Sequence, residues 1–462
     1  MPLGMLQAQQ LAHVIVVKAG KWNSHGFSKK NNRVCLSKKG ARSPGLGLAF
    51  EMSFLYVNER MSLLEPHLVD SLLKSKLSPF PVKEVHLNEA QGRILARDVH
   101  ADRNFPPFDR IMMDGISLRQ SELQEEKLTV LGLHPAGQPA PTLPLGLNCY
   151  QTMTGAPLPI GADTVVPVEL LEVEGDQVKI MPEGKEIAAG KFIHRAGTDA
   201  RKGDLLLKAG TRISAPEVAL LATVGLAQVP VAAHPKILIV STGNEVVPVE
   251  DRPLPHQIRR SNGYALAAAV AGAGFGEATL HHLSDDLEAT RDFLQSALKE
   301  YDLILTTGGI SKGETDYLKP VLVELVGQPT FHGVAQRPGK PLAHWATEKC
   351  HLFALPGNPN STMACFFRYV LPLLKQAAGG ESEVVEIEPT AVAIVGEATL
   401  NSHRHPDLTL LLFAKQVSPN NALEVQVLRN SGDLVGALSA THLLELPPLS
   451  ANLSSFRQFP LR

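Results

Sequence analysis

The chain is poor in cysteine and lacks long hydrophobic runs, and each absence excludes a class of protein. Only four of the 462 residues are cysteines, and they lie far apart without forming a CxxC pair. This spacing argues against a zinc ribbon or a disulfide framework and is typical of a reducing compartment. No run of about 18 apolar residues occurs, so we predict no transmembrane helix. The formal net charge of -2 provides no general attraction for nucleic acid, so local groups must hold any anionic ligand.

Several common catalytic motifs are also absent. The chain contains no Walker A motif, which disfavours an ordinary P-loop kinase or ATPase. It contains neither HExxH nor GxSxG. The 17 histidines show no spacing typical of metal ligands, and we expect His281 and His282 to be a surface pair. The functional residues must therefore be sought in loops.

The first 51 residues differ from the rest in their charge. They contain eight Lys or Arg residues against one acid, Glu51. Their apolar stretch, residues 11–17, is short and has no basic region before it, so we predict no secretory signal. We expect a disordered tail, or translated sequence upstream of a true start at Met52. The alternative is a basic interaction arm.

The remaining length and pattern predict several domains, because 462 residues exceed what one hydrophobic core accommodates. The apolar spacing predicts a helix from Leu63 to Leu77, and then a short strand followed by a helix in residues 84–99. Residues 101–200 are rich in Pro and Gly with short apolar runs, which indicates a small, mostly β domain. The runs in residues 380–462 predict another β domain.

Strands and helices alternate after Pro235. Three short apolar runs, Lys236–Val240, Asp302–Thr307 and His351–Leu355, each end in a glycine-containing turn that leads toward a helical stretch. This alternation predicts a parallel α/β sheet covered on both faces.

The turns after these three runs carry small polar residues. They are Ser241-Thr242-Gly243-Asn244-Glu245, Gly308-Gly309-Ile310-Ser311-Lys312-Gly313 and Pro356-Gly357-Asn358-Pro359-Asn360-Ser361. In open α/β sheets, ligands bind outside the carboxyl ends of the strands. Glycine lets the backbone approach a phosphate, and helix N-termini add free N–H groups. One such turn alone would serve only to reverse the chain, but three together predict an anion cradle.

Charged residues accompany these turns. Arg337 and Lys340 flank the Pro-Gly-Pro turn of residues 336–341 and can clamp a phosphate; the alternative is a solvated basic loop. Asp316 and the pair Asp285-Asp286 offer hard carboxylates of the kind that holds Mg²⁺ beside phosphates. The pair has an alternative role, because an acid at this position can cap a helix.

Two further acids, Asp114 and Asp199, lie in glycine turns of the first half. Composition alone favours a plain turn for both.

Together these motifs resemble the molybdopterin molybdenumtransferase family, called MoeA in bacteria and represented by the C-terminal domain of gephyrin in animals. The matching segments occur in the family's order over roughly residues 52–450. They are EAQGRILARDV, FPPFDRIMMDG, TMTGAPLPIGADTVVPVE, AGTDARKGDLLLKAGTRIS, STGNE, Ser261-Asn262, TTGGISKGETDY, RPGKP, LPGNPNS and NSGDLVGAL.

The resemblance implies a multidomain α/β and β fold. A central three-layer α/β molybdopterin-binding domain is joined to a β-rich lobe, a linking α/β segment and a small C-terminal β domain. The expected boundaries are 1–51 for the tail, 52–100 and 201–231 for the linking domain, 101–200 for the lobe, 232–379 for the α/β domain and 380–462 for the C-terminal domain. It further implies a homodimer whose active site lies between the α/β domain of one subunit and the lobe of the other.

The implied reaction takes adenylated molybdopterin and molybdate as substrates, releases AMP and leaves molybdenum on the dithiolene sulfurs, with Mg²⁺ as the assisting cofactor. The implied location is cytoplasmic. The implied partners are these small molecules, a second copy of the chain and the molybdopterin adenylyltransferase, with no nucleic acid and no membrane.

The resemblance also assigns roles to residues. The catalytic candidates are Asp114, Asp199, Asp316 and Lys340, and the metal candidates are Asp285 and Asp316. The substrate-binding candidates are Thr242, Gly243, Ser261, Asn262, Gly308, Gly309, Ser311, Gly313, Arg337, Pro338, Gly339, Pro356, Gly357, Asn358, Pro359 and Ser361.

The chain departs from the common pattern at Arg110, Ile111 and Met112, where many relatives have Asn, Ser and Ala, and at Arg260, where an acid is frequent. These arginines bring the charge of the cleft into question. Two alternative functions remain open from the sequence: the related adenylyltransferase, and a non-catalytic scaffold that binds a partner through the C-terminal β domain.

Overall fold

A computed structural model describes residues 63–76, 78–310, 316–380, 404–417, 422–426, 428–451 and 456–461, together with the backbone of residues 385–387. The predicted tail, residues 1–51, lies outside the described residues, as do Ser311 and Gly313 and the apolar run at 390–395. Among the described residues, no helix is long and apolar enough to cross a membrane.

The first described helix is shorter than predicted. Helix α1 spans Pro66–Lys74, inside the expected range, and begins at a proline whose fixed φ suits the first turn. The linking region continues with β1 (Val82–His86), which pairs antiparallel with β12 (Gln228–Ala232). Helix α2 (Ala215–Thr223) begins with a capping box between Ser214 and Glu217.

The helix expected within residues 84–99 is wrong. After β1 the chain forms only the short 3₁₀ helix η1 (Leu87–Glu89), and Gly92 turns it with φ +79°. The N–H of Leu95 then donates to the carbonyl of Thr211 at 2.8 Å, and Leu95 is fully buried beside Val231. Hydrogen bonding with distant backbone therefore overrides the local helical spacing. Tertiary contacts commonly outweigh the local propensity of an apolar segment in this way.

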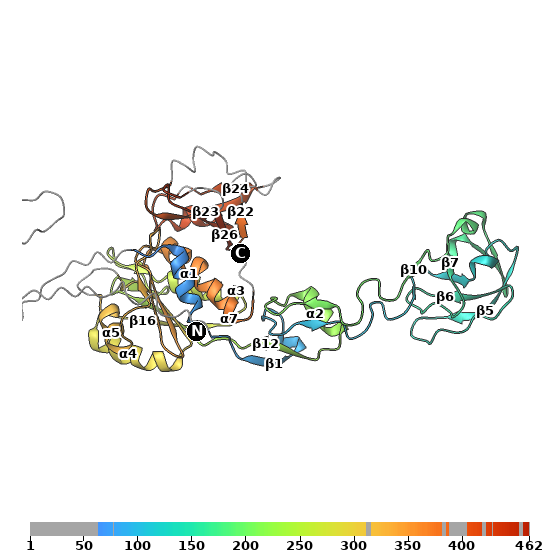
Figure 1. The fold of residues 1–462 in the computed structure, drawn as a ribbon, viewed down its shortest axis with the longest axis horizontal. Coiled ribbons are helices and arrows are strands. Elements are labelled where there is room, and N and C mark those ends of the chain that lie inside the picture. The colour runs from blue at the N-terminus through green and yellow to red at the C-terminus, as the bar shows by residue number, and fades with distance from the viewer. Residues whose placement is uncertain are drawn as a thin grey trace, which may run out of the picture. The chain divides into compact units, whose positions relative to one another are not determined.

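Residues 99–207 form the expected β structure. A sheet in the order β7-β4-β6-β5-β9-β8 encloses a core that includes Ile116, Leu118, Leu128 and Val178, and its strands β5, β6 and β7 are seen in Figure 1. Its strands are β4 (Gly115–Leu118), β5 (Leu128–His134), β6 (Asn148–Thr152), β7 (Thr164–Pro167), β8 (Leu171–Glu174) and β9 (Gln177–Ile180). Two short ladders accompany it, β2 (Val99–His100) with β11 (Leu205–Leu207) and β3 (Arg110–Ile111) with β10 (Ile193–His194).

The predicted α/β sheet is confirmed, with an addition. Its order is β16-β13-β17-β21-β20-β18, and the first four strands are parallel. The other two, β20 and β18, add antiparallel at one edge. Neither they nor the parallel edge strand β16 were predicted. The strands are β13 (Ile237–Thr242), β16 (Ala278–Leu283), β17 (Leu303–Thr307), β18 (Phe331–His332), β20 (Ala343–Ala346) and β21 (His351–Leu355).

Alternate residues of these strands bury against different helices, which makes three layers. Leu238, Val240 and Ile304 pack with residues of α4 (Leu287–Glu300) and α5 (Leu318–Leu325). These two helices lie side by side (Figure 1). Ile237, Ile239 and Leu305 pack instead with α3 (Asn262–Gly272), α6 (Pro359–Cys365) and the segment after it. That segment is the π-helix η5 (Phe366–Val370) followed by α7 (Leu371–Ala377). A strand buried on both faces explains the continuous apolar runs in the sequence.

The C-terminal residues form a further sheet, as expected. Its order is β19-β23-β25-β26-β22, and β24 pairs with β23. The strands are β22 (Val385–Ile387), β23 (Thr409–Val417), β24 (Ala422–Val425), β25 (His442–Leu446) and β26 (Phe456–Pro460). Its first strand, β19 (Gln336–Arg337), comes from the RPGKP segment and pairs with β23 at Thr409 and Leu410. The sheet thus incorporates part of the loop that carries two predicted site cations. The domain boundaries themselves stay predictions.

Candidate functional site

The structure brings the three predicted turns to one sheet edge. Strands β13, β17 and β21 are parallel and in register, so that Ser241 lies opposite Thr307 and Thr307 opposite Leu355. The Thr242 hydroxyl donates to the carbonyl of Thr307 at 3.3 Å. The N–H of Gly308 donates to the carbonyl of Leu355 at 3.2 Å. The described residues of the three turns, which end at Ile310 in the second turn, offer backbone and hydroxyl groups at this edge, and we name them the cradle.

The start of α3 closes one side of the cradle. Ser261 is the residue before the helix, and the amide of Asn262 donates to the carbonyl of Gly357 at 2.8 Å. This contact joins two sequence segments almost a hundred residues apart, both of which were predicted to bind substrate.

Two glycines allow the turns to approach each other. Gly308 has φ +92°, and a Cβ added there would lie 2.9 Å from the Thr242 hydroxyl oxygen. Gly309 has φ +66° and would place a Cβ 3.1 Å from the same oxygen. A side chain at either position would therefore strain the backbone and push Thr242 out of place.

We predict that Gly308→Ala lowers the free energy of unfolding by about 1–3 kcal/mol, the usual cost of a left-handed conformation in a residue other than glycine. It should also weaken binding of AMP, the product that the sequence resemblance implies, because the added methyl group crowds Thr242. Gly327→Ala is the matched control. Gly327 has φ +98° but no atom within 4 Å of an added Cβ. Calorimetric titration with AMP should separate the two variants, and equal AMP affinity in both would contradict a cradle role for Gly308.

The two acids before α4, Asp285 and Asp286, make different contacts. The Asp286 carboxylate accepts from the N–H of Ala289 at 2.7 Å and caps the helix, so its helix-capping alternative is confirmed. Asp285 instead joins the first turn: its N–H donates to the Asn244 side chain at 3.3 Å, and its carboxylate accepts from the Asn244 N–H at 3.4 Å.

A second acid near Asp285 was not predicted. The Glu245 carboxylate lies against Gly243, where an added Cβ would be 2.4 Å from its oxygen. Burial and the charge of Arg260 lower the pKa of His282, and Asp285 and Glu245 oppose that shift. Both carboxylates are therefore close enough to His282 to influence it electrostatically. Asp316, the other metal candidate, lies two residues before α5.

Asp285 and Glu245 form what we name the acidic corner. Arg260, one of the departures from the family pattern, lies near it, since its charge also acts on His282. Its Nε is buried and has no hydrogen-bond partner in the part of the chain that the structure describes. Its charge lowers the pKa of both His281 and His282, after the larger effect of burial. His281, predicted to lie at the surface, is exposed and stacks on Phe293.

The second predicted region, RPGKP, lines a cavity of about 600 Å³. Three cations, Arg337, Lys340 and Arg429, border it. Its polar lining includes Gln336, Asn360, Ser361, Gln426, Asn430 and Ser431, and its apolar wall is built from leucines of β23 and its neighbours. No carboxylate is among the described residues that line it. Among the described residues, no acid forms an ion pair with Arg337 or Lys340. We name this the anion cavity.

Sequence reasoning missed the C-terminal contribution to the cavity. Ser431 accepts from the Asn358 amide at 2.8 Å through its hydroxyl oxygen and from the Asn360 N–H at 3.0 Å through its carbonyl. The Asn360 amide donates to the carbonyl of Asp433 at 2.8 Å. The segment NSGDL at 430–434 was noticed as a family match, and its Asn-Ser pair was the available signal for a site role.

Asp114 and Asp199 are positioned by neighbours in the β region. The Asp114 carboxylate accepts from the N–H of Thr154 at 2.6 Å and from its hydroxyl at 2.8 Å. These hydrogen bonds, the backbone one first, lower the pKa of Asp114, so it is ionised at neutral pH. The prediction that both acids face the cradle of a second subunit stays a prediction.

The other departure, Arg110, contacts Asp199 through a histidine. Arg110 Nη2 lies 3.2 Å from His194 Nδ1. Because a guanidinium only donates, Nδ1 accepts, and His194 Nε2 carries the proton donated to Asp199 at 2.8 Å.

Comparison with known proteins agrees with this geometry. Residues 64–225 match the description "MoeA N-terminal region (domain I and II)", and residues 238–376 match "Probable molybdopterin binding domain". Fold and site thus define a multidomain protein with a molybdopterin-binding type of α/β domain.

The similarity extends to whole proteins. The molybdopterin molybdenumtransferase of Synechocystis sp. is 35% identical over 80% of this chain and 92% of its own length. The enzyme of the same name from Bacillus subtilis is 34% identical over 63% of this chain and 69% of its own length. The crystal structure of the molybdopterin biosynthesis MoeA protein from Pyrococcus horikoshii superposes with a TM-score of 0.69 at 27% identity, covering 87% of this chain and 99% of that one. The chain therefore belongs to the molybdopterin molybdenumtransferase family, which makes it a transferase of molybdenum cofactor biosynthesis.

Proposed function

We propose that this enzyme inserts molybdate into adenylated molybdopterin and releases AMP. One observation carries the proposal: the segment Pro356–Ser361, which is the turn after β21 and the first three residues of α6, belongs to both the cradle and the anion cavity. Its Gly357 carbonyl is bound by Asn262 at the cradle, whereas its Ser361 lines the cavity. A phosphate-bearing substrate at the strand ends and a free oxyanion in the cavity would therefore be held by adjacent parts of one segment, the turn after β21 and the start of α6.

The two sites suit the two substrates by their chemistry. The cradle offers N–H and hydroxyl groups at the strand ends, which bind phosphates through short, directional contacts. Its proposed ligands are Thr242, Gly243, Ser261, Asn262, Gly308, Gly309, Pro356, Gly357, Asn358 and Pro359, with Ser311 and Gly313 as further candidates from the sequence. The anion cavity offers three cations, two of which come from the RPGKP turn. Positive groups gathered around one cavity suit a dianion such as molybdate.

Mg²⁺ fits the acidic corner of the cradle. The described residues contain no group of three or more His, Cys, Asp or Glu side chains that could hold a metal alone. However, Mg²⁺ is commonly bound by one or two carboxylates together with substrate phosphates, and Asp285 meets the first turn there through Asn244. Asp285 and Asp316 are the proposed ligands, with Glu245 as an added candidate. The ion would neutralise phosphate charge during cleavage of the phosphoanhydride.

The remaining proposals concern assembly. Asp114 and Asp199 would complete the site from the lobe of a second subunit, which requires a homodimer. The molybdopterin adenylyltransferase, which would supply the substrate, is the proposed protein partner, and cytoplasmic location stays a prediction.

The deciding experiment incubates the protein with adenylated molybdopterin, molybdate and Mg²⁺ and measures AMP. The proposal expects AMP release that depends on molybdate. An adenylyltransferase would instead consume ATP with unadenylated pterin, and a scaffold would release no AMP under either condition. Either of these results would replace the proposal.

Asp114→Asn and Asp316→Asn are each expected to reduce AMP release strongly, by about 100-fold, because each removes a charge from the reacting centre while preserving side-chain size. Sedimentation of both variants should match the unchanged protein. Asp176→Asn is the control, since Asp176 lies in an exposed turn between β8 and β9. Normal turnover in the Asp114 and Asp316 variants would remove these acids from the mechanism.

A further inference from the structure

Gln336 is a fully buried polar residue beside the cations of the anion cavity. It precedes Arg337 in β19, and its side chain has no exposed surface. Its amide oxygen accepts a hydrogen bond from the Tyr369 hydroxyl. Its amide nitrogen donates to the carbonyl of Gly339 at 3.4 Å and lies 3.5 Å from the sulfur of Cys365.

The RPGKP turn is packed around this amide. Gly339 has φ +92°, and a Cβ added there would lie 2.6 Å from the Gln336 amide nitrogen and 2.5 Å from Cys365 Sγ. The turn between Arg337 and Lys340 therefore closes directly over the Gln336 side chain. A residue at position 336 must both accept from a hydroxyl and donate to a carbonyl, which an amide does and an apolar side chain does not.

The Tyr369 ring is packed against the side chain of Arg368. The Arg368 guanidinium lies 4.5 Å from the centre of the Tyr369 ring and 5.1 Å from that of Phe459. Burial raises the pKa of the Tyr369 phenol well above its ordinary value, so the hydroxyl stays protonated and can donate.

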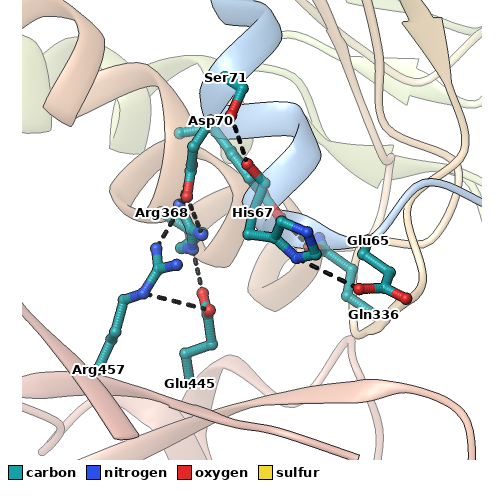
Figure 2. A network of polar contacts seen from close by, with 9 residues as sticks. Glu65, His67, Asp70, Ser71, Gln336, Arg368, Glu445 and Arg457 are labelled. Carbon is teal, nitrogen blue, oxygen red and sulfur yellow. Dashed lines mark hydrogen bonds and ion pairs between the residues drawn. The ribbon is translucent and has the colours of Figure 1, made fainter. Parts of the chain in front are cut away.

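Arg368 is fixed by acids from two other elements. It binds Asp70 of α1 through two hydrogen bonds of 2.7 and 2.9 Å, and it binds Glu445 of β25 through Nε. Arg457 of β26 contacts Asp70 at 2.8 Å and Glu445 at 3.8 Å. Figure 2 shows the four charged side chains converging, with Gln336 nearby. Arg368, which packs against the Tyr369 ring, is thus held by the carboxylates of Asp70 and Glu445.

We propose that Gln336 and Tyr369 are positioning residues: their buried hydrogen bond holds the RPGKP turn so that Arg337 and Lys340 point at the oxyanion substrate. This inference rests on the proposed function, because it assumes that the anion cavity binds molybdate. Gln336 borders the cavity, but its side chain has no exposed surface and both of its amide atoms are bonded within the protein, so neither residue binds the substrate in this proposal. They act by fixing two flexible cations that no carboxylate restrains in the described part of the chain.

The test measures molybdate and AMP binding separately, by calorimetric titration of the full-length protein. Tyr369→Phe and Gln336→Met should each weaken molybdate binding by about tenfold, the effect of losing one well-made hydrogen bond in a buried network. AMP, which probes the cradle, should bind unchanged. The double variant should bind molybdate no more weakly than the worse single variant, because both changes remove the same bond.

Thr164→Val is the matched control for the loss of a buried hydroxyl. The Thr164 hydroxyl donates to the side-chain oxygen of Gln120 at 2.6 Å in the β sheet of residues 115–180, and Thr164 is fully buried. Like Tyr369→Phe, the Thr164→Val variant removes one buried hydroxyl group, but it does so away from the anion cavity. Its molybdate affinity should match that of the unchanged protein.

The outcomes separate the inference from the proposed function. If molybdate binds equally well to the unchanged protein and to Lys340→Met, the cavity is not the molybdate site and the proposed function fails there. If Lys340→Met loses binding while Tyr369→Phe retains full affinity, the positioning role is overturned. Equal weakening of AMP and molybdate would also overturn it, by showing a general structural effect. Should Gln336→Met not fold, Tyr369→Phe, which removes one oxygen atom, carries the test.

Discussion

Replacing Lys340 by methionine is expected to lower the molybdate-dependent release of AMP by about 100-fold, the usual loss when one fixed electrostatic contact to a reacting group is removed. Methionine retains most of the length and the apolar stem of lysine but removes its charge. Lys340 borders the anion cavity together with Arg337 and Arg429, and in the part of the chain that the structure describes no acid lines the cavity to compensate their charge. The substrate oxyanion is therefore the group that their charge would balance.

The kinetic pattern distinguishes a binding role from a catalytic one. If Lys340 only holds molybdate, the KM for molybdate should rise and saturating molybdate should restore kcat; if it also stabilises the transition state, kcat should fall as well. Lys179→Met is the control, because Lys179 is an exposed lysine paired with Glu172 on neighbouring strands. A Lys340→Met enzyme with unchanged kcat and KM would refute the assignment of the cavity.

Replacing Arg368 by leucine is expected to lower the free energy of unfolding by about 3–5 kcal/mol, the typical cost of removing one partner from a buried ion pair. Only 2% of the Arg368 side chain is exposed, and it pairs with Asp70 and Glu445. Among the described residues, its removal leaves Glu445, which is 10% exposed, with only the longer 3.8 Å ion pair to Arg457. Arg291→Leu offers a control, because Arg291 is more exposed and its acids, Glu288 and Glu324, lie at the surface. That variant should unfold close to the temperature of the unchanged protein.

The effect of Arg368→Leu should depend on pH. Burial raises the pKa of Asp70, but the hydrogen bonds and charges of Arg368 and Arg457 outweigh it, so the pKa stays below the ordinary 3.8. A depressed carboxyl pKa stabilises the fold above the unfolded pKa, and this contribution is lost as the pH falls through the folded pKa. Without Arg368, burial is less well opposed and the pKa of Asp70 should rise. The difference in stability between the two proteins should therefore be largest above pH 3.8 and shrink as the pH falls through the lower folded pKa of Asp70; a difference independent of pH would contradict the charge-pair explanation.

The local sequence pattern was sufficient to predict the strand ends that carry the cradle. The runs that became β13, β17 and β21 are short and continuously apolar, and each leads into a turn rich in glycine and hydroxyl or amide side chains. Parallel strands bring such turns to one edge whatever the rest of the fold does. The same reasoning anticipated the capping role of Asp286, which depends only on the three residues that follow it.

Local pattern failed where a segment pairs with distant backbone. The expected helix around Leu95 was replaced by contacts with Thr211 and Val231, which lie more than a hundred residues away. The antiparallel strands β20 and β18 are too short to show a clear periodicity. Gln336 was visible only as part of a basic loop, since its partner Tyr369 is 33 residues distant.

The sequence alone determined the family, the alternation of strands with helices and the turns that we propose to bind phosphate, because each depends on residues that are close together in the chain. The tertiary structure alone decided that RPGKP is built into the C-terminal sheet, that Ser431 and Arg429 join the cavity, and that Arg368 supports Tyr369 beneath it. These contacts join segments separated by tens to hundreds of residues, and burial of shared apolar surface, which no local pattern encodes, is what brings them together.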